Sequence, residues 1–590
     1  MSFLLFRELS EYYQRLENTT KRLEMTDILR ELISKLGPED IDKVVYMTQG
    51  KLHPDWYGYP EIGMAEKTVL DVISATSGVP VEKVTSLLQE TGDIGLAAEK
   101  ALKNKIQRTI IQAFEPLTVQ YVYNQLDKIT RLSGKGSSED KKRLFSGLLH
   151  RCIPIEARYI SRIVTGNLRL GIADMTLMDA LSIALAGSKA SREDIERSYN
   201  ICSDLGLIAK NLLNSGVDWL KTIRLKVGVP VRMMLAQRLS TIEEIFDKIG
   251  RCAVEYKYDG ERFQIHKDKS DIRIFSRRLE SITEQYPDAV EIIRDSVKCD
   301  TCITEAECVA VDADNGEILP FQQLMHRRRK YEVEEAVETY PVKLFFFDCL
   351  YSDGRQMIDK PYPERRNLLE KIIRVNDKCE LSTQIITDNR DEFEKFFHEA
   401  VSTGCEGVIA KSILEDSLYQ AGGRGWLWIK YKRDYRSELT DTLDLVIVGA
   451  YVGKGRRTGT YGTLLAACYD PDSDVFKTVA RVGSGFKDED LSNLSNILKN
   501  LIVRSKNPRV DTNLEPDYWI LPKLVIEVKG AELTLSPIHT CAFSKIKSGV
   551  GLAIRFPRFT GRVRDDKSPE ESTTEEEIIE MYNNQMKRIK

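Results

Sequence analysis

The sequence lacks three features that would assign it to a class at once. No stretch approaches the roughly 20 consecutive apolar residues that a membrane-spanning helix needs. The 86 Lys and Arg residues are outnumbered by 90 Asp and Glu residues, and the net charge of −4 excludes a histone-like polycation. Internal repeats and low-complexity tracts are also missing. A protein whose net charge is close to zero can still carry a basic face that binds nucleic acid.

The cysteines give no sign of disulfides or of a metal site. The 11 cysteines are odd in number, scattered and often inside apolar runs, as expected for reduced thiols in a cytosolic protein. Only Cys299 and Cys302 form a Cys-x-x-Cys pair, and neither a second pair nor nearby histidines complete a zinc site. We therefore interpret these two as incidental cysteines beside a strand. Charge follows the first six residues, too early for a signal peptide, and predicts an intracellular protein.

The 590 residues divide into three segments with different patterns of apolar and polar residues. The first third has apolar residues at helical spacing, for example over 97–114 and 138–150. Strand-like segments begin near residue 250 and alternate with helical stretches, which indicates a mixed α/β or α+β domain. From about residue 443, short strands separated by Gly and Asp turns predict a small closed or partly open barrel.

One glycine-rich segment, residues 449–455, superficially resembles a phosphate-binding P-loop. It has three residues between its glycines instead of four, and Gly455 follows Lys454 where Ser or Thr should bind Mg²⁺. The spacing to Gly459 does not match a dinucleotide-binding loop either. A basic loop between two strands, able to touch a phosphate backbone, is the better interpretation.

The most informative segment is EYKYDGER, residues 255–262. Lys257 stands at the end of a predicted strand, with Asp259 and a glycine turn before Arg262. A lysine in this setting is a candidate nucleophile, and nearby cations or desolvation must lower its pKa because only the neutral amine attacks. The alternative is a surface lysine before a β-turn, which is the more frequent case for an isolated Lys-x-Asp-Gly.

Further charged and aromatic residues lie at predicted strand ends downstream. Each alone could be a solvated charge or a charge that protects an edge strand. Together they offer Lys and Arg for phosphates, carboxylates for a divalent metal and an aromatic ring for a base, as phosphoryl chemistry on a nucleotide requires. The segments are FSRRLE at 275–280, EAECVAVD at 305–312, FFFD at 345–348, CEGVIAK at 405–411 and WLWIKYK at 426–432.

In this order, the segments resemble those of the covalent nucleotidyltransferases, and specifically the ATP-dependent DNA ligases of the archaeal and eukaryotic replicative type. The resemblance covers nearly the whole chain. Residues 156–160 and 167–171 are similar to the helical DNA-binding domain of that family, and 527–537, 555–558 and 564–567 to its OB-fold domain. The Lys-x-Asp-Gly core is shared with RNA ligases and capping enzymes, whereas the flanking domains are more specific to DNA ligases.

The resemblance implies both the fold and the activity. We expect an all-α DNA-binding domain at residues 1–215, an α+β adenylation (nucleotidyltransferase) domain at 216–435 and a C-terminal β-barrel OB-fold at 436–590. The implied enzyme seals nicks between a 5′-phosphate and a 3′-hydroxyl in duplex DNA, through lysyl-AMP and an adenylated DNA end. It would serve DNA replication, repair and recombination. ATP and Mg²⁺ are the implied cofactors, with Mn²⁺ able to substitute for Mg²⁺.

The resemblance also assigns roles to individual residues. Lys257 would attack the α-phosphate of ATP and hold AMP as a phosphoramidate, and Lys430, Lys432 and Mg²⁺ would favour its neutral form. The residues implied to contact the nucleotide are Glu255 (adenine amino group), Phe347 (stacking on the base), Arg262 and Arg277 (ribose or phosphates), Glu307 (ribose), Lys411, Arg424, Lys430 and Lys432 (α-phosphate), and Arg564 and Lys567 (leaving pyrophosphate). The residues implied to hold the metal are Glu307 and Glu406.

DNA binding requires a basic inner face, because the average charge is slightly negative. Contacts mainly to phosphate and sugar would make binding weaken steeply with salt. The candidates, each of which could equally be a solvated charge run, are residues 327–330 (RRRK), residues 454–457 (KGRR), and Lys141, Lys142 and Arg143. The segment from Gln107 to Phe114 keeps the Gln and an aliphatic residue of a clamp-binding peptide but lacks its aromatic pair, so it is a weak signal for a sliding clamp. We expect a cytoplasmic monomer, associated with the nucleoid if the chain is archaeal.

Two other functions stay open at this point. An RNA ligase or capping-type transferase would share the Lys-x-Asp-Gly motif, although the N-terminal domain and residues 564–567 argue against it. A DNA-binding scaffold with an inactive site is the second alternative, and the intact set of motif lysines argues against that. NAD⁺ in place of ATP is disfavoured, because the zinc-finger cysteine cluster of NAD-dependent ligases is missing.

Overall fold

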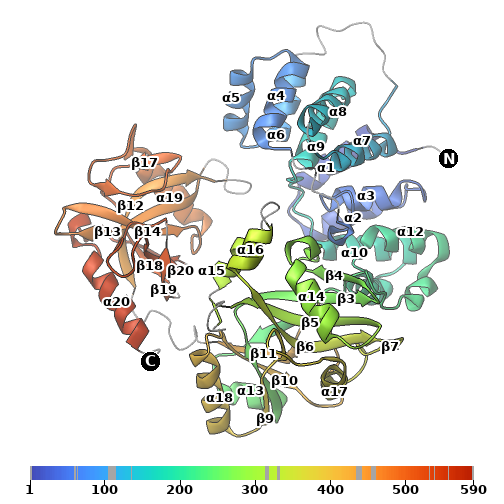
Figure 1. The fold of residues 1–590 in the computed structure, drawn as a ribbon. Helices are drawn as coiled ribbons and strands as arrows, with labels where there is room; N and C mark the ends of the chain where they lie inside the picture. The colour runs from blue at the N-terminus through green and yellow to red at the C-terminus, as the bar shows by residue number, and fades with distance from the viewer. Residues whose placement is uncertain are drawn as a thin grey trace. The chain divides into compact units, whose positions relative to one another are not determined.

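The computed structural model consists of two compact units, Met1–Tyr431 and Lys432–Lys590, and each is described by itself (Figure 1). The structure describes residues 3–58, 62, 64–103, 115–134, 136–311, 318–319, 321–327, 333–432, 442–453, 460–530, 532–536, 538–555 and 557–587.

The first unit begins with an all-helical part, drawn in blue to teal in Figure 1. Apolar residues recur every three or four positions, so each helix buries one face; in α1 the buried face includes Phe6, Leu9, Tyr13 and Leu16. The helices are α1 (Phe6–Glu17), α2 (Arg22–Ile33), α3 (Ile41–Thr48), α4 (Glu66–Ser77), α5 (Val81–Thr91), α6 (Ile94–Lys103), α7 (Val119–Arg131), α8 (Ser137–Arg151), α9 (Pro154–Val164), α10 (Asp174–Ala186), α11 (Arg192–Cys202) and α12 (Leu205–Ser215). Of the helix expected over 97–114, the structure describes the part up to Lys103, and the clamp-like segment lies outside the described residues.

Buried charges connect α1, α6 and α9 inside this helical part. The Arg162 side chain is 4% exposed and pairs with Glu17 and, at 3.0 Å, with Asp93. Arg158 adds a second ion pair to Glu17 at 2.7 Å. A Cβ at Gly95 would lie 2.5 Å from the carbonyl oxygen of Arg158 and 2.8 Å from Cγ of Arg162, so only glycine lets α6 approach α9 this closely.

The remainder of the first unit is built on two sheets. In the described residues, one sheet has the order β1-β11-β10-β2-β9 and the other the order β4-β3-β5-β6-β7, with β8 paired to β6. The strands are β1 (Leu235–Arg238), β2 (Cys252–Lys257), β3 (Glu261–Asp268), β4 (Asp271–Phe275), β5 (Thr301–Ala310), β6 (Val342–Ser352), β7 (Arg355–Gln356), β8 (Cys379–Leu381), β9 (Gln384–Thr387), β10 (Gly407–Ser412) and β11 (Arg424–Lys432). The helices are α13 (Ile242–Ile249), α14 (Pro287–Ser296), α15 (Phe321–Leu324), α16 (Val333–Thr339), α17 (Tyr362–Ile372) and α18 (Arg390–Ser402).

The chain passes from the first sheet to the second between β2 and β3. Lys257 is the last residue of β2 and Glu261 the first residue of β3. A Cβ at Gly260 would lie 2.2 Å from the carbonyl oxygen of Cys308 in β5, so only glycine fits where the turn crosses this strand. This crossing places Lys257 and Arg262 at the junction of the two sheets.

The second unit is rich in β-structure. Its strands are β12 (Leu443–Val452), β13 (Tyr461–Asp470), β14 (Val475–Val482), β15 (Ile502–Val503), β16 (Val510–Asp511), β17 (Tyr518–Ile520), β18 (Val525–Lys529), β19 (Glu532–Ser536), β20 (Gly551–Arg555) and β21 (Arg558–Val563), with helices α19 (Asp488–Lys499) and α20 (Glu575–Lys587). The main sheet has the order β15-β17-β12-β13-β14-β16, and β18 joins β12 to β21. In the residues that the structure describes, these pairings do not return to the first strand, so closure of the expected barrel is not seen.

The C-terminal helix α20 is held to this unit by one buried carboxylate. Glu575 accepts hydrogen bonds from Lys477 at 3.1 Å, from Lys545 at 2.6 Å and from the backbone of Ala542 at 2.6 Å. The expected sequence of a helical, an α+β and a β-rich part is thus confirmed.

All 11 cysteines are free thiols. Cys152 and Cys202 are half-buried, and the other nine are buried. None of the helices in the described part of the chain is both long and apolar enough to cross a membrane.

Candidate active site

Lys257 and Glu406 form an ion pair at the junction of the two sheets. Lys257 Nζ lies 2.5 Å from Glu406 Oε2, and the side chains are 22% and 20% exposed. In the antiparallel pairing of β2 with β10, Lys257 stands opposite Gly407. The backbone N–H of Glu406 donates to the carbonyl oxygen of Lys257 at 2.8 Å. Strand pairing therefore fixes both backbones, and either side chain remains accessible to a small ligand.

The electrostatic balance at Lys257 differs from the expectation. Burial favours the neutral amine, but the carboxylates of Glu406 and Glu307 outweigh burial, and the pKa of Lys257 is raised. Burial also raises the pKa of Glu307 to about 7, against the opposing effects of Lys257 and Arg262. In the chain alone, these carboxylates keep the pKa of Lys257 raised. The expected lowering of that pKa by Lys430, Lys432 and Mg²⁺ stays a prediction for the nucleotide complex.

Glu255, two residues before Lys257 on β2, is buried among hydrogen-bond donors. Its Oε2 lies 2.8 Å from Nζ of Lys411 on β10, and only 3% and 1% of the two side chains is exposed. Its Oε1 accepts hydrogen bonds from the hydroxyl of Tyr362 and, at 3.0 Å, from Nε2 of Gln384. Burial lowers the pKa of Lys411, against the opposing charge of Glu255.

Aromatic rings and cations alternate beside this pair. Lys411 Nζ lies 5.0 Å from the ring centre of Phe347 and 4.6 Å from that of Trp428. The guanidinium carbon of Arg262 lies 5.2 Å and 5.4 Å from the same two rings. Arg262 is held by Glu305 at 2.7 Å. Apolar ring faces next to fixed positive charge suit a ligand that combines an aromatic base with phosphates.

The predicted phosphate-binding residues of β11 are arranged along one strand. Lys430 and Lys432 are partly buried, and Arg424 is exposed at the start of the strand. Because β10 lies between β11 and β2, the strand axes that carry these lysines and Lys257 are about 10 Å apart.

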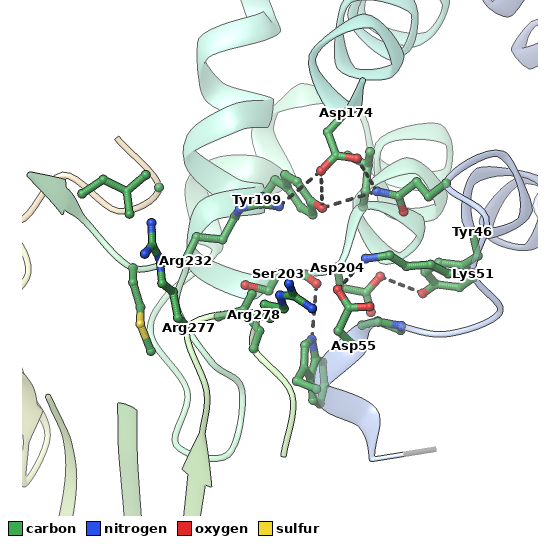
Figure 2. Close-up of a pocket in the computed structure, with 18 residues that line it drawn as sticks. Tyr46, Lys51, Asp55, Asp174, Tyr199, Ser203, Asp204, Arg232, Arg277 and Arg278 are labelled. Atoms are coloured by element: carbon green, nitrogen blue, oxygen red, sulfur yellow. Dashed lines mark hydrogen bonds and ion pairs between the residues drawn. The ribbon is translucent and has the colours of Figure 1, made fainter. Parts of the chain in front are cut away.

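Arg277 lies elsewhere in the first unit, in a cavity between the helical part and the loop after β4. The cavity of about 240 Å³ is also lined by Arg278, Asp174, Tyr199 and Arg232 (Figure 2). Arg232 pairs with Asp174 at 3.3 Å and lies 4.6 Å from the ring centre of Tyr199. None of the residues described above around Lys257 lines this cavity.

The two predicted residues of the second unit are paired within that unit. Arg564 Nη1 and Lys567 Nζ each lie 2.7 Å from the same oxygen of Asp444, Oδ2. Arg564 also contacts Asp566 at 2.8 Å. The bonds to Asp566 and Asp444 outweigh desolvation, and the pKa of Arg564 is raised.

One candidate for DNA binding is corrected by the structure. Arg327 is 1% exposed and pairs with Asp288 at 2.5 Å, so it supports the core beneath α14 and cannot face a duplex. The rest of that run, and residues 454–457, lie outside the described residues. On α8, Lys142 and Arg143 form ion pairs with Glu139 and Asp140 one turn away, and Lys141 approaches a backbone carbonyl at 3.5 Å.

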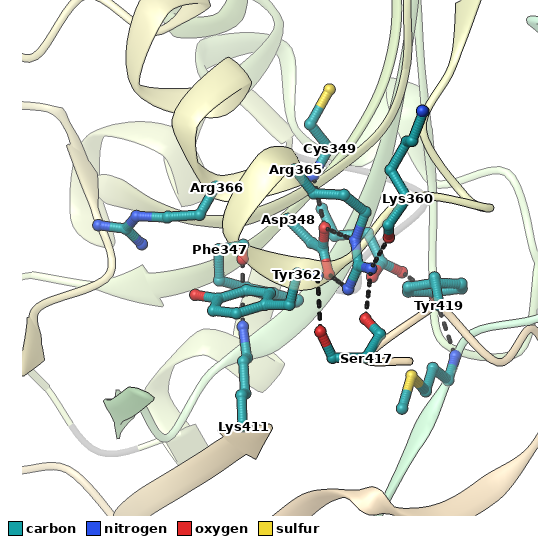
Figure 3. Close-up of polar contacts among 12 residues, drawn as sticks. Phe347, Asp348, Cys349, Lys360, Tyr362, Arg365, Arg366, Lys411, Ser417 and Tyr419 are labelled. Carbon is teal, nitrogen blue, oxygen red and sulfur yellow. Dashed lines mark hydrogen bonds and ion pairs between the residues drawn. The ribbon is translucent and has the colours of Figure 1, made fainter. Parts of the chain in front are cut away.

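The sequence prediction omitted the residues behind Glu255. Tyr362 at the start of α17 and Gln384 on β9 both reach its carboxylate, and Arg365 pairs with Asp348 beneath Phe347 (Figure 3). Gln384 arrives there because β9 pairs with β2 and places it opposite Glu255. No local sequence motif predicts that pairing. The one sequence signal is the helix start at Tyr362, which is flanked by prolines.

The carboxylates beside Lys257 match the requirements of Mg²⁺ when phosphates are also present. Within the described residues, no three His, Cys, Asp or Glu side chains gather closely enough to hold a metal ion by themselves. Mg²⁺ is usually held by one or two carboxylates together with substrate phosphates and water. Glu307 and Glu406 supply such a pair of oxygen ligands.

Comparison with protein families covers most of the chain. Residues 5–182 match the family "DNA ligase N terminus", residues 233–432 match "ATP dependent DNA ligase domain", and residues 457–567 match "ATP dependent DNA ligase C terminal region".

Individual proteins are similar over the full length. The chain is 52% identical to "DNA ligase 2" of Thermofilum pendens, over 99% of this chain and 98% of the relative. It is 50% identical to "DNA ligase" of Staphylothermus marinus, over 99% of both. Among solved structures, "Pmar-Lig_Pre." shares the fold with a TM-score of 0.53 at 17% identity, over 94% of this chain and 99% of that one.

Proposed function

Because this chain belongs to the ATP-dependent DNA ligases, enzymes that seal nicks in DNA, we propose that it does so through AMP carried on Lys257. Nζ of Lys257 would form a bond to the α-phosphorus of ATP while the bond to pyrophosphate breaks. AMP would then pass to the 5′-phosphate at a nick, and the 3′-hydroxyl would displace it. The observation that carries this proposal is the position of Lys257, at the end of β2 between the carboxylates of Glu406 and Glu307.

The nucleotide would lie between Lys257 and the aromatic rings. Phe347 would stack on adenine, and Glu255 would accept a hydrogen bond from the amino group of the base. Arg262 would contact the ribose or phosphates. Support comes from the distances of 5.0 Å and 5.2 Å that join Lys411 and Arg262 to the Phe347 ring, because two cations lie beside the ring that would stack on the base.

The remaining cations would serve the phosphates. Lys411, Lys430 and Lys432 would surround the α-phosphate with help from Arg424, and would stabilise charge on the transferring phosphoryl oxygens. Lys257 has to lose its proton before it attacks, since its raised pKa keeps it charged beside Glu406. We propose that approach of these cations to Lys257 in the nucleotide complex favours that loss.

Glu307 and Glu406 would hold Mg²⁺, with Mn²⁺ as a substitute. When bound, the ion would neutralise phosphate charge. Burial raises the pKa of Glu307 to about 7 in the chain alone, and a divalent cation would favour the ionised form of this carboxyl.

The second unit would complete the site when pyrophosphate leaves. Arg564 and Lys567 both pair with Asp444, which keeps the two cations next to each other.

We propose domain limits at residues 1–215, 216–435 and 436–590, with the last as the OB domain. Arg277 would contact the ribose or the phosphates of the nucleotide. We further propose that the enzyme acts as a monomer.

The test is transfer of label from α-³²P-labelled ATP to the full-length protein with Mg²⁺, followed by a chase with nicked duplex DNA. Wild type should acquire covalent label that survives denaturation of the protein, and should release it as the nick is sealed. Lys257→Ala should acquire none. Lys298→Ala, which removes an exposed lysine of the same domain, should behave as wild type.

Each other outcome has a definite meaning. Label that persists in Lys257→Ala would place the covalent AMP on another residue. Label that moves only to RNA ends would indicate an RNA ligase or capping-type transferase. A wild-type chain without covalent label would contradict the proposal and leave a DNA-binding scaffold.

A further inference from the structure

Tyr362 is fixed in a buried position behind the nucleotide-binding residues. Only 1% of the residue is exposed. Its backbone N–H donates to both the carbonyl oxygen and Oγ of Ser417, each at 3.0 Å, and it begins α17 directly after Pro361. The start of the helix therefore determines where the ring lies, next to Phe347 and Lys411 in Figure 3.

The phenol makes contact with both partners of the Glu255–Lys411 ion pair. Its hydroxyl donates to Glu255 Oε1, and its ring centre lies 4.6 Å from Lys411 Nζ. Gln384 Nε2 completes the arrangement, 2.6 Å from the tyrosine hydroxyl and 3.0 Å from Glu255 Oε1. One carboxylate oxygen of Glu255 thus faces Lys411, and the other faces Tyr362 and Gln384.

Such a set of donors determines the chemical character of Glu255. Because Tyr362 and Gln384 donate to one oxygen and Lys411 pairs with the other, the carboxylate presents hydrogen-bond acceptors and no donor. It therefore attracts an amino group on a base and repels a carbonyl oxygen at the same position. A site built around a hydrogen bond rejects a ligand that lacks the matching group far better than an apolar pocket does.

We infer that Tyr362 is a positioning residue that holds Glu255 as a fixed hydrogen-bond acceptor and so sets the preference for adenine. The inference rests on the proposed function, in which Glu255 faces the base. Tyr362 would act through Glu255 without touching the nucleotide. Loss of its hydroxyl would leave Gln384 as a donor to Oε1, with the guanidinium of Arg366 at 3.8 Å as a competing partner for the carboxylate.

The experiment compares two nucleotides that differ in one amino group. Adenylation of the full-length protein is followed with ATP and with purine riboside triphosphate, which has hydrogen in place of the 6-amino group. In wild type, kcat/KM for covalent AMP formation should favour ATP. In Tyr362→Phe, which keeps the ring, this preference should fall about tenfold, as expected for loss of a hydrogen bond to a charged group. The fall should appear in KM for ATP, with kcat nearly unchanged and purine riboside triphosphate unaffected.

Further variants separate positioning from general damage. Glu255→Gln should also lower the preference, and Tyr362→Phe should add nothing in that background. Gln384→Met should cause a smaller fall in the same direction. The matched control is Tyr159→Phe in the helical part, because Tyr159 is equally buried and donates to Glu17 at 2.8 Å. It should leave the preference intact.

Three results would overturn the inference. An unchanged preference in Tyr362→Phe would show that Glu255 needs no such support. Equal losses for both nucleotides would indicate a purely structural role. A preference that survives Glu255→Gln would refute the inference and also the proposed contact of Glu255 with the base, whereas absence of any covalent AMP in wild type would refute the proposed function itself.

Discussion

Arg365 and Asp348 form an ion pair in which neither side chain is exposed to solvent. Nε of Arg365 lies 2.8 Å from Oδ1 of Asp348, and Nη2 lies 3.1 Å from Oδ2, so the contact is bidentate. Arg365 also donates to the backbone carbonyls of Lys360 and Ser417. The pair connects α17 to the residue that follows Phe347 on β6.

Breaking this pair should destabilise the first unit strongly. In Arg365→Met, Asp348 would remain as a buried charge without a partner, and loss of one member of a buried pair costs about 3–5 kcal/mol. Chemical denaturation followed by circular dichroism measures the change. The double variant Arg365→Met with Asp348→Leu should recover most of the loss, because neither charge is then buried alone. Arg355→Met, at an exposed position, is the control. A double variant as unstable as the single one would argue against an electrostatic origin.

Removal of Lys430 should slow phosphoryl transfer more than it weakens nucleotide binding. A cation that stabilises the transferring phosphoryl group acts mainly in the transition state, and loss of such a contact costs about 100-fold in rate. In Lys430→Ala, single-turnover adenylation should therefore slow by about this factor, with a change of only a few-fold in the ATP concentration at half-maximal rate. Lys298→Ala should match wild type. A normal adenylation rate in Lys430→Ala would contradict the role assigned to this residue.

Stability should depend on pH through Glu307. Its pKa is raised from 4.5 to about 7 in the folded chain, so the folded state binds the proton more tightly than the unfolded state. The resulting stabilisation is fully present below about pH 4.5 and is lost as the pH rises through 7, by an amount on the order of 3 kcal/mol. Thermal unfolding of wild type and Glu307→Gln across this range measures it. Wild type should lose stability relative to the variant as pH rises, and the exposed Glu291→Gln should not reproduce the difference. Parallel profiles for wild type and Glu307→Gln would refute this.

The buried charges of the helical part should matter far more than its surface pairs. Arg162→Met would leave Glu17 and Asp93 with reduced compensation, and we expect a loss of about 3–5 kcal/mol in the free energy of unfolding. Arg143 pairs with Asp140 on α8, with the side chains 79% and 48% exposed. Arg143→Met should change stability by no more than about 0.5 kcal/mol. Similar effects of the two substitutions, measured by denaturation, would contradict the distinction.

Much of the fold was predictable because its signals are local. Helical periodicity in the first third, strand segments after residue 250 and short strands after residue 443 each reflect the burial of one face of an element. The signal for Lys257 is also local, because the end of its strand and the following Gly260 lie within eight consecutive residues. Closure of the C-terminal barrel could not be predicted from local signals, because it depends on pairing between strands far apart in the sequence.

The omissions at the site have the same physical origin. Tyr362 and Gln384 reach Glu255 across 107 and 129 residues of sequence. Nothing in either local segment identifies that partner. Arg327 is the opposite case. The run of cations at residues 327–330 suggests an exposed DNA-binding surface, but Arg327 is buried and pairs with Asp288. The direction of the Lys257 pKa also depends on spatial neighbours, which sequence order does not reveal.

The burial of the thiols makes this chain well suited to spectroscopic study of its moving parts. Buried sulfhydryls react slowly with maleimides, so Cys152→Ser and Cys202→Ser would remove the two half-buried groups and leave a background of low reactivity. Single cysteines introduced as Arg143→Cys in α8 and Glu576→Cys in α20, both at exposed positions, would then accept a donor and an acceptor fluorophore. Energy transfer between them would follow the separation of the two units through a single round of nick sealing.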